Sequence, residues 1–232
     1  MPGPTQARRR DPPSLAAEGR SARKRETIVE AATALFLERG YLATSIDQIA
    51  ALAGVSKPTV YRFFADKDAL LEHIVLGTLD RAGDPFRASL PRLGSSENLE
   101  GDLRNVARNY IAMVTQPAVL QLRRLVIGAS HQLPELARSY YEHAPEQTLS
   151  ALGDAFQRLA ERGLLTLEDP LLAASHFAFL VIGRVLDKSL FSTDTPFSRR
   201  ELNRQADAGV TVFLAAYGAD APRTAAPASG RR

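Results

Sequence analysis

The spacing of apolar residues at intervals of three and four is the feature that most limits what this 232-residue chain can fold into. The pattern i, i+3, i+4, i+7 recurs along the chain, whereas almost no segment alternates with a period of two. Its first clear run ends before Gly40 and consists of Ile28, Ala31, Ala32, Leu35 and Phe36. Such spacing puts apolar side chains on one face of a helix, so an all-α fold is expected.

Prolines and glycines divide this pattern into helices. We expect one helix over residues 23–39, two short helices within 44–64, a fourth that begins after residue 66, and five more over 97–115, 117–132, 134–162, 169–191 and 198–217. Pro145 should kink or divide one of them, because an internal proline removes a backbone hydrogen bond. Gly83, Pro85, Pro91 and Gly94 interrupt the periodicity, which predicts a domain boundary there.

Two unequal helical domains with flexible ends are therefore expected. The predicted parts are a disordered basic leader at residues 1–22, a helix-turn-helix domain of three helices at 23–82, a linking helix, a larger helical bundle at 97–217 and a disordered tail at 218–232. Residues 1–25 hold seven Arg or Lys and two acids, so the overall charge of +3 leaves −2 on the remainder. A basic arm suits DNA phosphates, although a solubilising leader explains the charge equally well.

Composition excludes several kinds of site. Hydrophobic residues make up 45% of the chain and charged residues 24%, as in soluble globular proteins. The absence of cysteine excludes disulfides, thiolate nucleophiles and cysteine zinc sites, and fits a reducing cytoplasm. The four histidines lack metal-ligand spacing, and the leader carries prolines where an export signal needs an apolar run. No catalytic residue, metal site or cofactor is expected, because the chain holds no nucleophile elbow, phosphate-binding glycine loop or HExxH.

The segment TSIDQIAALAGVSKPTVYRFF, residues 44–64, predicts two short helices joined by a tight turn. Thr44 and Asp47 have the spacing of a capping box at the start of the first helix. Gly54 can turn the chain, and Ser56 can cap a second helix whose Pro58 falls in the first turn, where proline is favoured. These features together indicate a helix-turn-helix.

The second of these helices carries a basic tip that suits the major groove of DNA. Lys57, Pro58 and Thr59 stand at its start, where side chains reach base edges, while Tyr61 and Arg62 can reach phosphates. Each of these residues alone is more often a solvated surface residue. Their order after a cap and a glycine turn favours DNA binding over that alternative.

The run from Arg25 to Leu71 resembles the N-terminal domain of the TetR family of transcriptional regulators. The matching features are Gly40-Tyr41, the Thr44-Ser45 pair, the Ala-Gly-Val-Ser run at 53–56, Tyr61 to Phe64, and Lys67. The resemblance implies that Lys57, Pro58 and Thr59 face bases while Thr44, Tyr61 and Lys67 hold the DNA backbone. Many members carry His at the position of Phe63, so no phosphate contact is assigned to Phe63. The complete candidate DNA-binding set is Thr44, Ser45, Ser56, Lys57, Pro58, Thr59, Tyr61, Arg62 and Lys67.

The rest of the chain resembles the AefR-type C-terminal domain, notably in LRRLVIGASHQLPELARSYYEHAP and RGLLTLEDPLLAASHFAFLVIG. This resemblance implies a ligand-binding domain that dimerises through its last two helices. The apolar stretch at 171–183 is too short to cross a membrane, and burial against a second subunit is expected. The candidate interface residues are Phe177, Val181, Val185, Val210, Phe213 and Tyr217.

A ligand pocket is expected inside the helical bundle. Candidate lining residues are Tyr110, Met113, Phe156, His176 and Phe179, although each is more often plain core. The expected function is a dimeric, cytoplasmic repressor that binds a near-palindromic double-stranded operator and is released by a small-molecule effector. The alternative is a DNA-binding regulator or architectural protein that has no effector.

Overall fold

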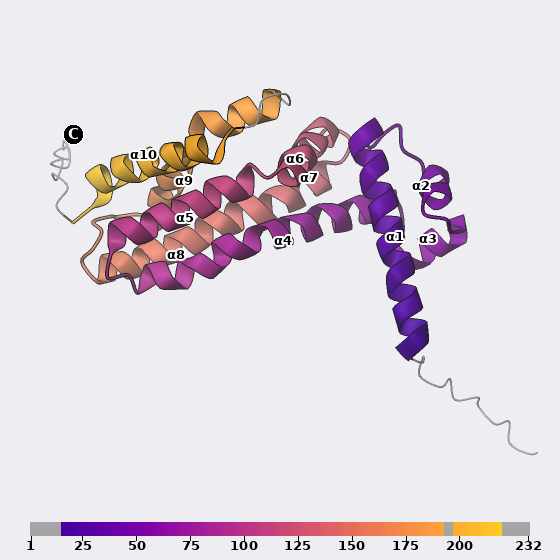
Figure 1. Cartoon of the computed structure of the whole chain (residues 1–232), viewed down its shortest axis with the longest axis horizontal. Helices are drawn as coiled ribbons and strands as arrows, with labels where there is room; N and C mark the ends of the chain where they lie inside the picture. The colour runs from indigo at the N-terminus through magenta and orange to yellow at the C-terminus, as the bar shows by residue number, and fades with distance from the viewer. Residues whose placement is uncertain (1–14, 193–196, 220–232) are drawn as a thin grey trace, which may run out of the picture. The chain divides into compact units, whose positions relative to one another are not determined.

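A computed structural model describes residues 15–192 and 197–219 of the chain (Figure 1). The described part is helical, with one isolated bridge between Leu165 and Gly218 and no longer strand, so the prediction of an all-α fold is confirmed. The helices are α1 Leu15–Arg39, α2 Ile46–Leu52, α3 Lys57–Phe63, α4 Lys67–Gly94, α5 Leu99–Val114, α6 Pro117–Ala129, α7 Pro134–Tyr141, the π-helical turn η1 Glu142–Glu146, α8 Gln147–Glu161, α9 Pro170–Phe191 and α10 Arg199–Tyr217.

Contacts divide the chain into an N-terminal unit that ends at residue 74 and a C-terminal unit that begins at residue 75. The core of the N-terminal unit lies among α1, α2, α3 and the first turns of α4. Its fully buried side chains include Ile28, Phe36, Ile49, Val60 and Leu70. These are the inward positions of the apolar pattern, and their burial gives this small unit its stability.

The first helix begins earlier than the sequence predicts. α1 starts at Leu15, so residues 15–22 are helical rather than disordered. Ala, Leu, Arg and Lys make up most of residues 15–25, and all four are strong helix formers. The rest of the predicted leader, residues 1–14, and residues 220–232 of the predicted tail lie outside the described residues.

The glycines and prolines after residue 82 do not end the helix, because α4 runs unbroken through Gly83, Pro85 and Pro91. Both prolines are exposed, while Phe86, Leu90 and Leu93 are at most 6% exposed and belong to the core of the C-terminal unit. An interior proline costs a helix about 3 kcal/mol, whereas full burial of one large apolar side chain contributes roughly 1.5–3 kcal/mol. Burial of that apolar face therefore outweighs the local preference of proline.

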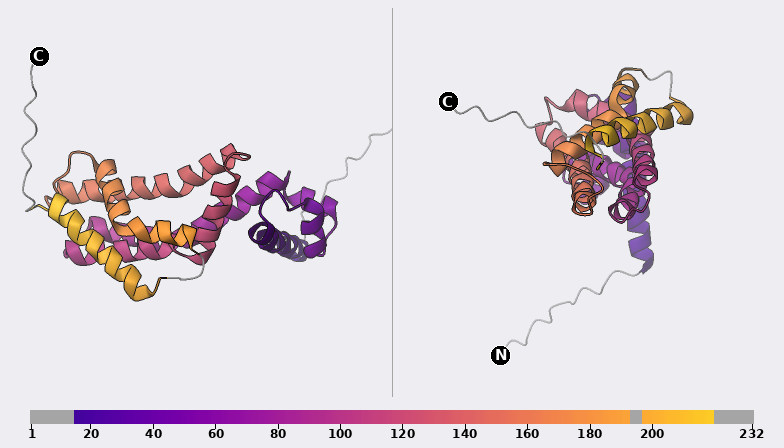
Figure 2. Two further views of the ribbon diagram at one scale, coloured as in Figure 1. Left: turned by 90° about the horizontal axis from the view of Figure 1, so that it is seen from above. Right: turned by 90° about the vertical axis from the view of Figure 1, so that its left-hand side faces the viewer.

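The C-terminal unit is a bundle in which α10 packs on α9 and α5, and α8 packs on α9 (Figure 2). Three fully buried rings lie at its centre. Phe156 lies 5.4 Å from Phe177 and 5.0 Å from Phe213, and Phe177 and Phe213 are 5.1 Å apart, measured between ring centroids. As predicted, Pro145 divides the long third helix of this region, and it does so within the π-helical turn η1.

Helix α9 confirms the helix predicted over residues 169–191 and includes the apolar stretch at 171–183. It continues to Phe191 across a kink at Gly183, whose φ of 25° and ψ of −127° lie outside helical values. By length and composition α9 is apolar enough to cross a membrane, contrary to the expectation from the shorter stretch. Its inner face is nevertheless packed in the protein core, which is also how a core helix of this composition behaves.

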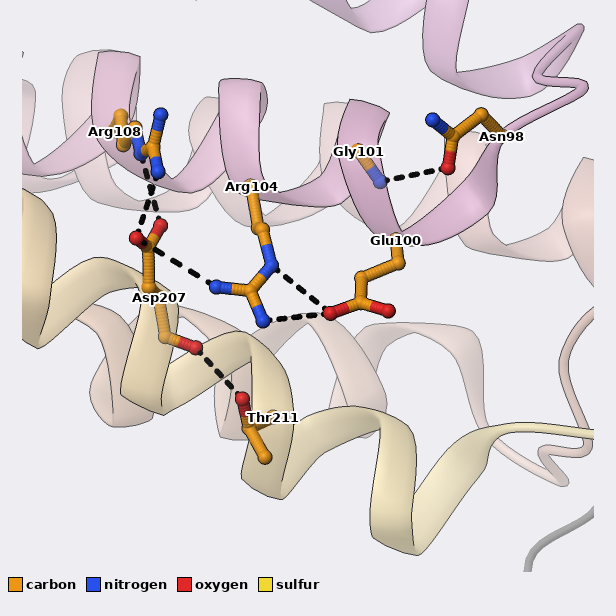
Figure 3. Close-up of polar contacts among 7 residues, drawn as sticks. All are labelled: Asn98, Glu100, Gly101, Arg104, Arg108, Asp207 and Thr211. Carbon is orange, nitrogen blue, oxygen red and sulfur yellow. Dashed lines mark hydrogen bonds and ion pairs between the residues drawn. The ribbon is translucent and has the colours of Figure 1, made fainter.

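A charged cluster joins α5 to α10 in the C-terminal unit (Figure 3). Arg108 donates from Nε and Nη2 to the two carboxylate oxygens of Asp207, at 2.9 and 2.7 Å. Arg104 pairs with the same carboxylate at 3.6 Å and with Glu100 at 2.6 Å. The hydrogen bond and charge of Asp207 raise the pKa of Arg108. One carboxylate thus holds two arginines of α5 against α10.

Candidate DNA interface and ligand cavity

The helix-turn-helix begins with a capping box, one residue later than predicted. Ser45, not Thr44, is the N-cap of α2: its hydroxyl accepts from the Gln48 amide at 3.2 Å, and the Gln48 side chain accepts from the Ser45 amide at 2.8 Å. The predicted box of Thr44 and Asp47 is therefore wrong. Gln at the third helical position serves as well as Glu, because both carry an acceptor that reaches back to the cap.

The turn between α2 and α3 has the expected form. Gly54 adopts a φ of 65°, which residues with a Cβ adopt only at a cost, and the Val55 amide donates to the Ala50 carbonyl at 3.0 Å. Ser56 stands at the N-cap of α3, but its side chain makes no capping hydrogen bond to the helix, and its hydroxyl lies 2.8 Å from the Thr59 hydroxyl instead. Pro58 falls in the first turn of α3, as predicted.

The tip of α3 presents Lys57 and Pro58 as exposed residues and Thr59 as a half-buried one. The Lys57 ammonium is paired with the Asp47 carboxylate of α2 at 3.0 Å, and this hydrogen bond and charge raise the pKa of Lys57. Asp47 therefore holds the cation at the start of α3. Spacing alone does not reveal this role, because the two residues are ten apart in sequence.

Two further candidates are exposed on α3. Tyr61 is 47% exposed, and Arg62 places its guanidinium over the Phe63 ring, 4.9 Å from the centroid. Phe63 thus supports a cation instead of supplying the polar nitrogen that a histidine would offer. Both Tyr61 and Arg62 remain accessible to a ligand.

Two residues predicted to hold the DNA backbone, Thr44 and Lys67, also make hydrogen bonds within the protein. Thr44 is 2% exposed, and its hydroxyl donates to the Gly40 carbonyl at 2.8 Å. The Lys67 ammonium donates to the carbonyl oxygens of Tyr41 at 3.0 Å and Thr44 at 2.9 Å, and it lies 4.0 Å from the Tyr41 ring centroid. Two of the three ammonium protons are therefore committed to the loop before α2.

Tyr41 also ties the loop before α2 to α4, although the sequence analysis named it only as part of the Gly40-Tyr41 motif. Its hydroxyl donates to the Asp68 carboxylate in the first turn of α4. The pKa of Tyr41 is raised, mainly because the hydroxyl is buried and secondly because it donates this hydrogen bond to Asp68. The loop before α2 is thus fastened to α4 through both Lys67 and Tyr41, which fixes the start of the helix-turn-helix.

A cavity of about 620 Å³ lies within the C-terminal unit. Its walls come from α4, α5, α6, α7, η1, α8 and α9, and most of the lining side chains are apolar. Three of the five predicted lining residues, Tyr110, Met113 and Phe179, do line it. A volume in this range accommodates an organic molecule of moderate size.

The other two predicted lining residues lie elsewhere. Phe156 is fully buried in the ring cluster with Phe177 and Phe213 and is plain core. His176 is exposed, and its Nδ1 lies 2.5 Å from the Tyr217 hydroxyl. Neither Phe156 nor His176 is among the residues that line the cavity, so these two predictions are wrong.

Few polar groups reach the cavity, and most are paired with the protein's own residues. Arg123 on α6 donates from Nε to the Tyr140 hydroxyl of α7 at 2.9 Å. Sequence reasoning missed Arg123, because an Arg-Arg pair on a helix gives no sign of which member faces inward. Burial raises the pKa of Tyr110 to about 12, although the nearby charge of Arg123 acts to lower it.

The residues predicted to form a dimer interface are mostly internal to the chain, so that prediction is wrong. Five of them are at most 3% exposed and belong to the core of the C-terminal unit: Phe177, Val181, Val185, Val210 and Phe213. The sixth, Tyr217, is half-buried, and burial raises its pKa. The periodic apolar faces of α9 and α10 therefore face their own bundle.

Two family descriptions match the two parts of the chain. Residues 28–74 match the bacterial regulatory proteins of the tetR family. Residues 101–219, about half of the chain, match the C-terminal domain of AefR-like transcriptional repressors.

Individual similar proteins are also regulators of transcription. A protein described as a TetR-family transcriptional regulator from Mesorhizobium loti MAFF303099 is 40% identical, with a TM-score of 0.78 over 86% of this chain and 98% of that one. The flavonoid-responsive regulator FrrA is 31% identical, with a TM-score of 0.73 over 86% of this chain and 100% of its own. The curated regulator HbdR from Aromatoleum sp. (strain CIB) is 37% identical over 101 residues, 44% of this chain and 40% of HbdR. The chain thus matches less than half the length of that curated relative.

Proposed function

The chain belongs to the TetR family of transcriptional regulators, and we propose that it is a repressor that grips operator DNA as a dimer and is released by a small molecule in the cavity. The observation that carries the DNA-binding part is the exposed tip of α3 behind a well-formed capping box and glycine turn. Since it acts on DNA, we place it in the cytoplasm.

The proposed division of labour on α3 separates bases from phosphates. Lys57 leaves Asp47 to donate to guanine acceptors, and Thr59 meets a base edge or a thymine methyl group. Tyr61 and Arg62, with the hydroxyls of Ser45 and Ser56, contact phosphates. The side chains of Thr44 and Lys67 act indirectly, by fixing the loop before α2.

The proposed dimer interface uses the outer faces of α9 and α10. Exposed residues there include Leu172 on α9 and Val212 on α10, which are 51% and 53% exposed. Ala208 and Ala215, also exposed, share the face of Val212 and leave room for a partner helix. A two-fold dimer carries two copies of α3, so its operator should be near-palindromic, with half-sites roughly 34 Å or more apart.

The proposed effector acts by a population shift. It binds preferentially to a form of the dimer whose two α3 helices no longer match the half-site spacing. By linkage, effector and operator weaken each other's binding by the same factor.

The test is selection of bound fragments from random DNA, repeated with small molecules present. Enrichment of a near-palindromic sequence that declines with a cavity ligand is the expected result. An enriched sequence whose affinity no cavity ligand changes would favour the regulator or architectural protein without an effector. The absence of any enriched sequence would contradict the proposal.

A further inference from the structure

The charged side chains around the cavity are all basic. Arg87, Arg123 and His143 line it, and no Asp or Glu is among the described residues that do so. The other lining residues are apolar or neutral. A site with this balance favours an anion, because a buried or half-buried cation is costly without a counter-charge.

Two of the three basic groups already have acidic partners in the C-terminal unit. Arg87 pairs with Asp84 of the same helix at 2.7 Å. The Nε2 of His143 lies 2.8 Å from the carboxylate of Asp80. Arg87 and His143 therefore already have acidic partners, and neither residue needs the negative charge of a ligand.

Arg123 is the exception. Among the described residues of the C-terminal unit, 75–192 and 197–219, no carboxylate lies within 4.0 Å of Arg123, and its Nη1 and Nη2 atoms make no hydrogen bond. Its single bond runs from Nε to the hydroxyl of Tyr140, a side chain that is only 6% exposed. The guanidinium is always charged in proteins, so its two outer nitrogens remain ready for an anionic ligand.

We propose that the cavity binds an amphipathic carboxylic acid, with its carboxylate on the two outer nitrogens of Arg123 and its apolar body among Phe86, Met113 and Ile182. This inference rests on the proposed function in taking the cavity as the ligand site. A guanidinium offers two parallel N–H donors that match the two oxygens of a carboxylate. Tyr110, whose pKa burial raises to about 12, stays a neutral hydroxyl at physiological pH and is available as a further donor.

The size of the cavity restricts the acid further. A volume of about 620 Å³ exceeds what acetate or another short acid fills. Most of the remaining lining is aliphatic or aromatic, so the gain from burial grows with the apolar area of the ligand. The ligand class is therefore an acid with a ring system or a long chain.

The experiment measures binding by titration calorimetry on the full chain without DNA. The probes are matched pairs of an acid and its neutral methyl ester: naphthalene-2-carboxylate with its ester, and decanoate with its ester. The acid of at least one pair should bind about tenfold or more tightly than its ester, the scale of a charge-assisted hydrogen bond. Equal binding within both pairs, or no binding of any probe, would overturn the inference.

Variants locate the anion. Arg123→Gln should abolish the preference for the acid, and Arg123→Lys should retain part of it. Arg138→Gln, an exposed residue of α7 outside the cavity lining, removes the same charge and should leave the preference intact. If Arg123→Gln fails to fold, the comparison of acid and ester on the unaltered protein still decides.

The two proposals fail in different ways. If the acid binds through Arg123 while operator affinity stays unchanged, this inference stands and the proposed effector role of the cavity fails. If the ester binds as tightly as the acid and releases the operator, the proposed function stands and the proposal of a carboxylic acid ligand fails.

Discussion

The contact between Lys57 and Asp47 decides how the tip of α3 meets DNA. The carboxylate of α2 holds the ammonium of α3 at 3.0 Å, and both side chains are largely exposed. Exposed pairs of this kind are weak and readily exchanged. Lys57 can therefore exchange its ion pair with Asp47 for a hydrogen bond to a base. The negative charge of Asp47 repels a DNA surface that presents only phosphates.

Replacement of Asp47 by Asn should loosen specificity. Lys57 then becomes free to neutralise a phosphate on any sequence, so the affinity for random DNA should rise and its salt slope should steepen by about one. Fluorescence anisotropy at several salt concentrations measures both quantities. An affinity for random DNA that stays the same would show that Asp47 does not restrain Lys57.

Tyr110 gives a pH dependence that belongs to a single residue. Its pKa is raised by burial to about 12 from an ordinary value of 10, so the folded state favours the protonated phenol. The resulting stability is fully present below pH 10 and is lost as the pH rises toward 12, by up to about 3 kcal/mol. Urea unfolding of the protein and of Tyr110→Phe at pH 9 and pH 11 isolates the effect: the phenylalanine variant should lose less stability over this interval, and equal losses would contradict the assignment.

The helices show which parts of the fold local sequence can predict. Periodicity and first-turn prolines predicted α5, α6, α9 and α10 to within a few residues, because these signals act within one helix. The continuity of α4 through Pro85 and Pro91 could not be predicted, because it depends on burial against other helices. The kink falls at Gly183, where glycine adopts a φ of 25° that other residues resist, but a glycine within an apolar run does not by itself predict a kink.

The junction of α5 and α10 can be tested through one carboxylate. Asp207→Asn removes the negative charge that Arg104 and Arg108 share, which leaves Arg108 without its carboxylate partner and Arg104 with Glu100 alone. These side chains are partly exposed, so solvent screening limits the expected loss to about 1 kcal/mol of unfolding free energy. Urea denaturation measures it against Asp154→Asn, an exposed aspartate of α8 that should change little. Equal effects of the two variants would show that the cluster adds nothing to stability.

At the scale of the whole molecule, the sequence predicted which kinds of site the protein has better than it predicted which residues form them. The apolar faces of α9 and α10 were assigned to a partner because they are wide, yet Phe177 and Phe213 lie in the chain's own core. Periodicity shows only that a side chain is removed from water. Burial in the chain's own core and burial in a subunit interface both meet this condition. The same limit explains why Tyr110 was placed correctly at the cavity while Phe156 was not.

Val212→Glu should separate the proposed dimer without unfolding its subunits. Val212 is 53% exposed on α10, so a charge there costs the single chain little but would be buried between two copies. Sedimentation velocity should show a dimer for the unaltered chain and for the control Ser150→Glu, an exposed residue of α8, and a monomer for Val212→Glu. A dimer that tolerates the glutamate would place the interface elsewhere.

The most direct test of the account is the ratio of operator affinity to random-DNA affinity in Lys57→Ala, compared with the unaltered protein and with Arg138→Ala at equal salt. Because Lys57 is proposed to contact bases, its loss should lower this ratio by about tenfold or more, while Arg138→Ala leaves it unchanged. A ratio that survives the loss of Lys57, with both affinities reduced equally, would show that α3 does not read sequence through this side chain.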